Sequence, residues 1–369
     1  MGAGMSVMRA IIAGATLVAC GSSSEGPREA VAPPGSVSPP AGPVPTTGPT
    51  TVLPDSGAPP KAAAPLELVA VTFNTGMHDQ NPNDSFSGSN AKIVETYYGS
   101  GLSYNAAIVD TSKWFSTLDA DVVGLQEIFD PAECAGVPLD KRSGFVCETW
   151  KPGDPTVAQS VLGAGYQIAC HPGHHDICLG VKLTFGKFQG CTGALCLDGL
   201  TGGAHTCGVG ARVARGVIDL AGGGTLTAVS VHASSGSKTE NFDCRTKQFD
   251  QIFVDLDGAP AANGQRNIIL GDFNTDPGRL TAIDASAKAL ANRVGTGKSF
   301  HFVTDVGPSV TPTYQSPLVP LLPVGFNIDH VVSDKLDGSC WTAGLTSGHP
   351  PVSSTEYFDH KPGVCALKE

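Results

Sequence analysis

Charged residues are scarce in this chain of 369 residues, because Asp, Glu, Lys and Arg together make up only 15% of it. This composition, with 46 Gly and 28 Pro, suits a loop-rich α/β or β-rich protein better than a helical bundle. Basic residues are fewer than acidic residues: the chain has 23 Lys and Arg and 34 Asp and Glu, which gives a formal net charge of -11. An acidic balance predicts no long-range attraction for nucleic acid or anionic lipid, although a metal ion and a few local basic side chains can still dominate a site.

The N-terminal apolar segment is too short to span a membrane. Arg9 precedes the ten residues AIIAGATLVA, whereas a transmembrane helix needs about 20. We therefore predict a signal peptide over residues 1–19 rather than a membrane anchor. The segment ends in LVAC, which resembles the processing box of bacterial lipoproteins, and this resemblance implies that Cys20 is the lipidated first residue of the mature protein. The alternative is an ordinary secretory signal followed by an unrelated Cys.

Residues 20–65 are mostly Pro, Ala, Gly, Ser and Thr, a composition that buries too little apolar surface to offset chain entropy. We expect them to form a semi-extended tether behind Cys20, and residues 66–369 to form one folded domain. The protein is thus expected to be exported, and either lipid-anchored to the bacterial cell envelope or secreted.

The cysteine count agrees with export. The chain has 11 Cys, and ten of them remain when Cys20 is set aside. An even number in an exported chain predicts up to five disulfides, whose pairing the sequence leaves open. A zinc site is the alternative, because CHPGHHDIC (170–178) interleaves three His between two Cys. Its spacings match no common zinc ligand pattern, and the compartment favours oxidation.

Alternating apolar residues predict strands and helical spacing predicts helices, in mixed order along the domain. Strands are predicted within residues 66–76, 120–130, 211–220, 225–234, 266–273 and 326–334, before a terminal segment at 357–367. Helices are predicted within residues 105–118, 245–256 and near 279–290. The glycine-rich region 134–207 is predicted to form long loops pinned by disulfides. Two sheets packed face to face, with helices outside, would cover both faces of the apolar strands.

Polar residues recur where the predicted strands end. They are Asn74, Glu127, His232, Asp272, Asn274, Asp329, Asp359 and His360. Each one alone has an ordinary explanation as a turn former, a rim charge or a strand-end side chain. If the strand ends converge, however, the set forms a pocket of carboxylates, amides and imidazoles, which suits a hard divalent cation beside acid/base groups.

The segments that carry these residues resemble a known family. VTFNTG, VVGLQEI, VSVHASSGS, ILGDFN, NIDHVVSD and FDHKPGV occur in the order typical of the endonuclease/exonuclease/phosphatase superfamily. The resemblance covers Val71 to Val364. It implies a four-layer α/β/β/α sandwich of two mixed β-sheets flanked by helices, with a divalent-metal site.

The same resemblance implies how the metal is held. Glu127 resembles the family's principal metal ligand, Asn74 resembles the amide that supports that site, and Asp359 is expected to share in it. The expected cofactor is Mg²⁺, with Mn²⁺ or Ca²⁺ as alternatives.

Five further residues are implied to carry the chemistry. Asp272 and Asn274 resemble the groups that align the attacking water and bind the phosphoryl oxygens. His232 matches the position that contacts the scissile phosphate. Asp329 resembles the acid that orients His360, which is the expected general base or transition-state stabiliser.

The chain departs from the family pattern at three points. Phe358 stands where a Ser usually precedes the final Asp-His pair, and Gly363 replaces a usual apolar residue. The second acid, which partners His232 in the deoxyribonuclease branch, is not identified in the sequence.

We predict a divalent-metal-dependent phosphoester hydrolase, in first place a nuclease-type phosphodiesterase. The expected partners are a phosphodiester substrate, either nucleic acid or a phospholipid head group, and the membrane through lipidated Cys20; the expected state is a monomer. A sphingomyelinase-like phospholipase C is the second alternative. Arg245 and Gln248 follow the strand that ends at His232, as they do in both nuclease-like and sphingomyelinase-like members of the family that the sequence resembles. A catalytically inactive surface binding module is the third.

Overall fold

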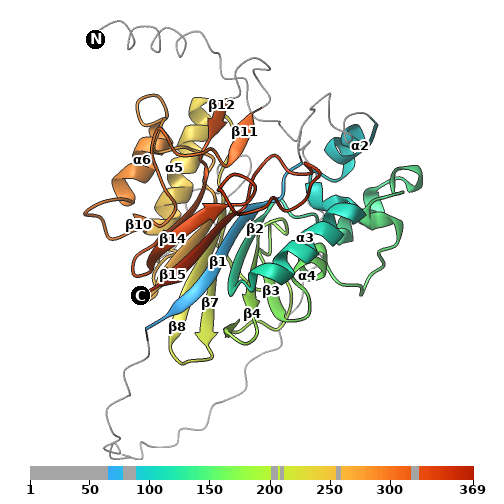
Figure 1. The fold of residues 1–369 in the computed structure, drawn as a ribbon, viewed down its shortest axis with the longest axis horizontal. Coiled ribbons are helices and arrows are strands. Elements are labelled where there is room, and N and C mark those ends of the chain that lie inside the picture. The colour runs from blue at the N-terminus through green and yellow to red at the C-terminus, as the bar shows by residue number, and fades with distance from the viewer. Residues whose placement is uncertain (1–64, 78–88, 201–206, 208–211, 255–258, 317–323) are drawn as a thin grey trace, which may run out of the picture.

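The structure is a computed structural model, and it describes residues 65–77, 89–200, 207, 212–254, 259–316 and 324–369. Two β-sheets pack face to face, with helices on the outer side of each (Figure 1). The predicted fold class, a sandwich of two mixed sheets flanked by helices, is therefore confirmed. The predicted signal peptide, Cys20 and nearly all of the tether lie outside the described residues.

The first sheet has six strands in the order β14-β15-β1-β2-β4-β3. Their bounds are Asp337–Thr342, Gly363–Lys368, Glu67–Asn74, Val122–Gln126, Cys178–Lys182 and Tyr166–Cys170. Only β1 and β2 run parallel among these neighbours; the other pairs are antiparallel. The predicted strands within 66–76 and 120–130 thus lie side by side at the centre of this sheet.

The second sheet has the order β10-β13-β9-β8-β7-β5, and β6 also pairs with β7. Its strands are His301–Phe302, Asp329–Ser333, Asn267–Asp272, Thr225–His232, Val213–Leu220, Gly186–Phe188 and, for β6, Asp198–Leu200. Strands β8 and β9 are parallel, and β13 runs antiparallel to β9. A separate two-stranded sheet joins β11 (Tyr314–Ser316) to β12 (Val324–Phe326).

The helices cover the outer faces of the sandwich (Figure 1). They are α2 (Ser89–Tyr97), α3 (Asn105–Leu118), α4 (Val157–Leu162), α5 (Thr239–Phe253) and α6 (Ala285–Arg293). Short 3₁₀ helices follow Ser100 and lie in the loop after β2, at Gly101–Ser103, Pro131–Gly136, Leu139–Lys141 and Val146–Glu148. Within the described residues, no helix combines the length and the apolar character needed to cross a bilayer.

Three apolar clusters correspond to the three interfaces of a four-layer sandwich. One packs α3 and α4 on the first sheet, with Phe73, Trp114, Phe115 and Leu125 among its members. The second lies between the sheets and contains Ala70, Leu179, Ile218 and Leu270. The third packs α5 and α6 on the second sheet, with Val231, Phe249, Ile269 and Leu290. Both faces of each sheet are buried, which explains the dense apolar runs of its central strands.

The ten cysteines after Cys20 form five disulfides. The pairs are Cys134–Cys147, Cys170–Cys178, Cys191–Cys196, Cys207–Cys244 and Cys340–Cys365. The prediction of up to five disulfides agrees with this pairing. No thiolate among these cysteines is left for zinc. His171 is also unsuitable as a ligand. Its Nδ1 accepts hydrogen bonds from the backbone of Gly173 and His174, so the proton of the neutral imidazole is on Nε2, which then has no lone pair for a metal.

The prediction of long loops for region 134–207 is wrong in part. The region contains α4 and four strands, and the hairpin of β3 and β4 forms one edge of the first sheet. These strands are only three to five residues long, and they lie among the many glycines of this region, which conceal their short apolar runs in the sequence. The predicted helix within 245–256 begins earlier, at Thr239, and the one near 279–290 begins at Ala285, where the Asp284 side chain caps it.

Candidate active site

The register of the second sheet places three of the predicted residues in a row. On the parallel strands β8 and β9, His232 lies beside Asp272, and on the antiparallel pair β9 and β13, Asp272 lies beside Asp329. All three side chains are almost fully buried. Strand pairing alone therefore brings together residues that are up to 97 positions apart in the sequence.

The first sheet contributes the opposite wall. Strands β1 and β2 are parallel and end together, so that Asn74 pairs with Gln126 and Glu127 follows directly. Asp359 and His360 lie just before β15, the other neighbour of β1. The face-to-face packing of the two sheets then joins both walls at one edge of the sandwich.

Asn74 connects the two walls through its amide. Its Nδ2 donates to Oε1 of Glu127 and to Oδ2 of Asp272, both at 3.0 Å. Its Oδ1 accepts a hydrogen bond from the backbone of Gly76 at 2.9 Å. With both ends of the amide engaged, Asn74 orients the two carboxylates, which agrees with a supporting position rather than with direct ligation of a cation.

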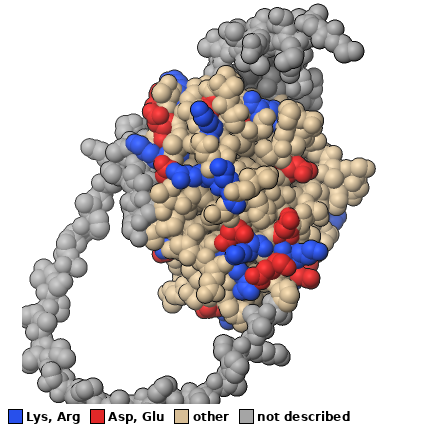
Figure 2. Space-filling model, turned by 90° about the vertical axis from the view of Figure 1, so that its left-hand side faces the viewer, with Lys and Arg blue, Asp and Glu red and all other residues tan. Residues whose placement is uncertain are grey.

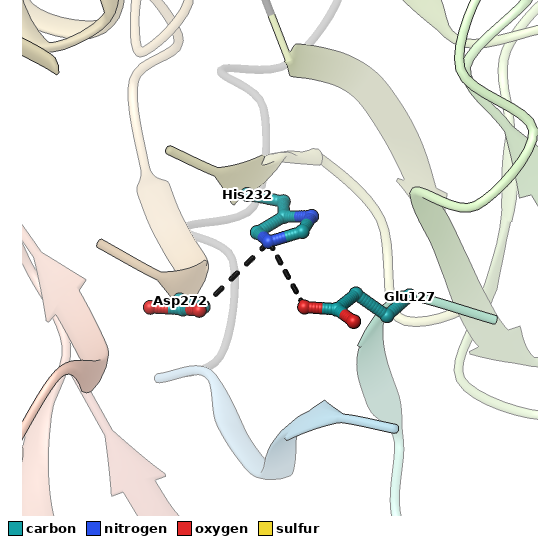
Figure 3. Close-up of side chains that lie close together, drawn as sticks. All are labelled: Glu127, His232 and Asp272. Atoms are coloured by element: carbon teal, nitrogen blue, oxygen red, sulfur yellow. Dashed lines mark ion pairs between the residues drawn. The ribbon is translucent and has the colours of Figure 1, made fainter. Parts of the chain in front are cut away.

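His232 faces Glu127 and Asp272 (Figure 3). Its Nε2 lies 3.2 Å from Oε1 of Glu127 and 3.9 Å from Oδ2 of Asp272. Its Nδ1 lies 3.1 Å from Nη1 of Arg212 and 3.7 Å from Oδ2 of Asp176. Burial acts to lower the pKa of His232, but the carboxylates of Asp176 and Glu127 outweigh it and raise this pKa to about 9.

Asp176 and Arg212 are the residues that sequence analysis missed. Asp176 lies in the loop between β3 and β4, which the disulfide Cys170–Cys178 closes, and it reaches His232 across 56 positions of sequence. The available signal was an acid two residues before a short apolar strand, in HHDICLGV. That signal was hidden because the strand itself was not predicted.

Asp329 and His360 form the shortest ion pair of the site. Oδ2 of Asp329 lies 2.8 Å from Nδ1 of His360. Nε2 of His360 therefore points toward the other carboxylates of the site and lies 3.9 Å from Oδ2 of Asp272 and 4.0 Å from Oδ1 of Asp359. Burial acts to lower the pKa of His360, but Asp329 and Asp359 outweigh it and raise this pKa well above 6.5.

Asn274 and Glu127 adopt left-handed backbone conformations, with φ of 50° and 54°. Asn tolerates this region, whereas Glu there costs about 1–2 kcal/mol. Asn274 donates from Nδ2 to Asp272 and to the carbonyl of Ala233, and its backbone amide donates to Oδ1 of Asp272 at 2.7 Å. Strain of this kind is a recurrent feature of functional sites.

The carboxylates of the site differ in how far they are neutralised. Burial acts to raise the pKa of Glu127, but His232 and Asn74 outweigh it and lower this pKa to about 2. Asp272 and Asp359, by contrast, stay incompletely neutralised. Burial raises the pKa of Asp272 to about 6, with His360 acting against the shift and Asp329 adding to it. Burial also raises the pKa of Asp359 to about 7; His360 opposes this shift, while Glu127 and Asp272 add to it. Negative charges crowded in a desolvated place produce this effect, and a cation bound there would reverse it.

The donor set fits a divalent cation. Two groups of side chains offer ligand atoms that all lie within 4.8 Å of one another: Glu127, His232 and Asp272, and Asp272, Asp329 and His360. The buried atoms Oδ1 of Asp329 and Oδ1 of Asp359 have no hydrogen-bond partner among the described residues. Carboxylate oxygens without donors are the ligands that Mg²⁺, Ca²⁺ and Mn²⁺ prefer.

Asp359 belongs to neither of these groups, although the sequence predicts it as a metal ligand. It lies instead beside Gly76: a Cβ on that glycine would sit 2.8 Å from Oδ1 of Asp359 and 2.9 Å from Oε2 of Glu127. Both carboxylates therefore border the space that the missing side chain leaves open. The role of each of the eight predicted residues stays a prediction, while their convergence is a property of the structure.

Asp276 shows that the acids of GDFNTDP do not share one function. Its Oδ1 accepts from the backbone of Gly278 and Arg279, and its Oδ2 accepts from the backbone of Asn327 and pairs with Nη1 of Arg279 at 2.5 Å. A buried carboxylate with all of its acceptor positions occupied organises the loop. It has nothing left to offer a ligand.

Phe358 and Gly363 fit the site despite departing from the family pattern. Phe358 is buried edge-on against Phe73 at a ring distance of 4.8 Å, and its backbone bridges to Met77. Gly363 pairs with Thr72 on β1 and with Thr342 on β14. Both residues thus hold the segment that carries Asp359 and His360 against the first sheet.

Similar sequences and structures are found among known proteins. A sequence profile described as the Endonuclease/Exonuclease/phosphatase family matches residues 71–354. Among curated proteins no match is found. TDP2 of D. rerio, humanized by 14 mutations, is 15% identical with a TM-score of 0.45, over 82% of this chain and 98% of that chain.

Two bacterial structures are similar to the same degree. A family protein from Bacteroides thetaiotaomicron is 10% identical with a TM-score of 0.45, over 83% of this chain and 96% of that chain. The beta toxin of Staphylococcus aureus is 15% identical with a TM-score of 0.45, over 81% of this chain and 99% of that chain.

Proposed function

The chain belongs to the endonuclease/exonuclease/phosphatase family, and on this premise we propose that it is a divalent-metal-dependent phosphodiesterase of the nuclease type. Members of this family are phosphoester hydrolases and generally use divalent metals. The observation that carries the proposal is the convergence of four carboxylates, two amides and two imidazoles at one edge of the sandwich.

Asp329 and His360 are arranged for proton transfer. The carboxylate of Asp329 holds Nδ1 of His360, which fixes the orientation of the ring and leaves Nε2 on the side of Asp272. His360 would take or give a proton at Nε2 as the phosphoester is attacked. A positioned acid/base group of this kind contributes about 10²- to 10⁴-fold to the rate.

The remaining side chains would hold the reacting groups. Asp272 and Asn274 would orient the attacking water, and His232 would donate from Nε2 to a phosphoryl oxygen. Glu127 and Asp359 would hold the cation. The chemistry that a divalent cation supplies in such a site is neutralisation of the charge that develops on the phosphoryl oxygens.

Asp176 favours the nuclease type over the sphingomyelinase type. In the deoxyribonuclease branch a second acid partners the histidine at the position of His232, and Asp176 lies 3.7 Å from Nδ1 of that side chain. The pair supports a histidine that acts as a donor to the substrate. Sphingomyelin cleavage is therefore the second candidate rather than the first.

The surface charge does not select a substrate. On the face drawn in Figure 2, Lys and Arg side chains lie beside Asp and Glu side chains among the described residues. With a net charge of -11 for the whole chain, steering toward nucleic acid is weak, so binding must depend on the site itself.

A substrate panel tests the proposal. The full chain carrying Cys20→Ala would be assayed with Mg²⁺, Mn²⁺ and Ca²⁺ on plasmid DNA, RNA, sphingomyelin vesicles and a bis-nitrophenyl phosphate ester. We expect turnover of nucleic acid that a chelator abolishes, and a loss of about 10²- to 10⁴-fold in His360→Ala. Turnover of sphingomyelin alone would favour the second candidate, and a folded, metal-binding protein without turnover would favour a binding module.

We also propose that the protein is exported and held at the cell envelope through lipidated Cys20, as a monomer. The five disulfides support an oxidising compartment, and two or more acyl chains on one residue would give stable attachment. Wild type should partition into the detergent phase and incorporate a labelled fatty acid, whereas Cys20→Ala should do neither. Release of an unlabelled wild-type protein into the medium would instead support plain secretion.

A further inference from the structure

Thr313 contacts the segments that carry both members of the Asp329–His360 pair. Its Oγ1 accepts hydrogen bonds from the backbone amides of Ile328 and Asp329, both at 3.2 Å. Its carbonyl accepts from the backbone amide of Lys361 at 2.8 Å. Thr313 is itself buried, so these contacts are shielded from water. One residue thus ties the start of β13 to the segment that precedes β15.

Tyr314 covers the imidazole of His360. The backbones of the two residues form an antiparallel bridge, and their ring centroids lie 4.8 Å apart at an interplanar angle of 44°. Tyr314 is only 4% exposed, so its ring is held in place by its surroundings. The contact restricts rotation of the imidazole, whose Nδ1 must stay aligned with Asp329.

The Asp329–His360 pair needs such a link because its members belong to different sheets. Asp329 is on β13 of the second sheet, and His360 precedes β15 of the first. A small shift of one sheet against the other would lengthen the 2.8 Å contact between Oδ2 and Nδ1. Misplacement of a reacting group by about 1 Å can cost about 10²-fold in rate.

We propose that Thr313 and Tyr314 are positioning residues that lock the Asp329–His360 pair into the geometry required for proton transfer. In this proposal neither Thr313 nor Tyr314 contacts the substrate. The inference rests on the proposed function, because a positioned imidazole matters only if His360 moves a proton.

The kinetic test compares Thr313→Val with Thr313→Ser and with Thr304→Val. Thr304 is the matched control, because its buried Oγ1 also accepts from a backbone amide of β13, that of Val331 at 3.3 Å, and contacts Nδ1 of His330. We expect Thr313→Val to lower kcat by about 10- to 100-fold with KM unchanged within about 2-fold. Thr313→Ser should have the kcat of wild type. Thr304→Val should also keep the kcat of wild type, although its Tm should fall about as much as that of Thr313→Val.

Proton NMR of the full chain with Cys20→Ala provides a readout that does not depend on activity. The proton between Nδ1 of His360 and Asp329 should give a low-field resonance in wild type, Thr313→Ser and Thr304→Val. The resonance should be broadened or lost in Thr313→Val and in Tyr314→Leu, but kept in Tyr314→Phe, which retains the ring.

Two results would overturn the inference. One is a Thr313→Val variant that keeps both kcat and the resonance. The other is a parallel loss of kcat and Tm in Thr313→Val and Thr304→Val, which would make Thr313 merely structural. If wild type turns over none of the substrates, the proposed function fails, and the resonance in these variants still decides whether Thr313 and Tyr314 align the pair.

Discussion

Two buried groups of charged side chains in this molecule differ in how their charge is balanced. One is the Arg245–Asp284 pair between α5 and α6, with Nη2 of Arg245 3.0 Å from Oδ2 of Asp284. Arg245 also donates to Ser286 and to two backbone carbonyls, so the guanidinium is well satisfied. The other is the candidate active site, where four carboxylates face two imidazoles and two buried carboxylate oxygens have no partner among the described residues.

The difference separates charge that stabilises the fold from charge that is available for a ligand. A buried pair with matched hydrogen bonds holds its surroundings together, and removing one partner leaves an uncompensated charge. The candidate site has the opposite property, because burial raises the pKa values of Asp272 and Asp359 and the fold must tolerate their crowding. Four predictions test this contrast.

The largest expected effect on stability comes from Arg245→Met. The substitution keeps most of the side-chain volume but leaves Asp284 buried without its cation, so the free energy of unfolding should fall by about 3–5 kcal/mol. Denaturant unfolding followed by circular dichroism measures it. Arg293→Met is the control, because Arg293 pairs with Asp250 at 2.8 Å on the exposed surface, where the loss should stay below about 1 kcal/mol. Equal losses of unfolding free energy in Arg245→Met and Arg293→Met would show that the buried Arg245–Asp284 pair stabilises the fold no more than a surface ion pair does.

In the candidate active site, Asp359→Asn should lower activity without lowering stability. The change removes one of the crowded negative charges, so in chelator the Tm of the variant should equal or exceed that of wild type. Activity should fall at least about 100-fold, because the proposed function makes Asp359 a ligand of the cation, and even residues that only orient such ligands contribute about 10- to 100-fold. Added Mg²⁺ should raise the Tm of wild type more than that of the variant. A lower Tm in chelator would show that Asp359 contributes to the fold.

Gly101→Ala should disturb the site through the segment that carries it. A Cβ on Gly101 would lie 2.6 Å from the carbonyl oxygen of Tyr357 and 2.7 Å from Cδ1 of Phe358, directly before Asp359. The overpacking should cost about 1–3 kcal/mol and lower activity as well. Gly136→Ala is the control, because its Cβ would meet nothing within 4 Å. A Gly101→Ala protein with unchanged unfolding and turnover would mean that the Phe358 segment adapts freely.

Features that depend on residues close together in the sequence could be predicted. The apolar spacing within 105–118 predicts a helix, and α3 spans Asn105–Leu118. The two strands within 211–220 and 225–234 form the antiparallel pair β7 and β8, because a short Gly-rich turn joins them. The strand-end positions of Asn74, His232 and Asp272 could likewise be read from apolar runs that stop at a polar residue.

Contacts that depend on pairing between distant segments could not be predicted. Strand β4 was missed because its five residues gain their burial from β2, more than fifty positions earlier. Asp176 was missed with it, since the residue reaches His232 only once the two sheets are packed. The sequence also could not show that Asp272 lies in the candidate site while Asp276 only organises its loop. Asp276 is bound by Arg279 and by the backbone amide of Asn327, and the contact with Asn327 forms only in the folded chain.

The smallest expected effect is the pH dependence of the Arg245–Asp284 pair. Burial acts to raise the pKa of Asp284, but Arg245 and the hydroxyl groups of Ser286 and Thr275 outweigh it and hold this pKa below 3.8. A depressed folded pKa contributes stability above the unfolded value of about 3.9, and this contribution is lost as the pH falls through the folded pKa. The gap in unfolding free energy between wild type and Asp284→Asn should therefore be constant from pH 7 to 5 and narrow below about pH 4. Denaturant unfolding at each pH measures the gap, and a gap that persists at pH 3 would show that hydrogen bonding, rather than the charge of Asp284, stabilises the contact between α5 and α6.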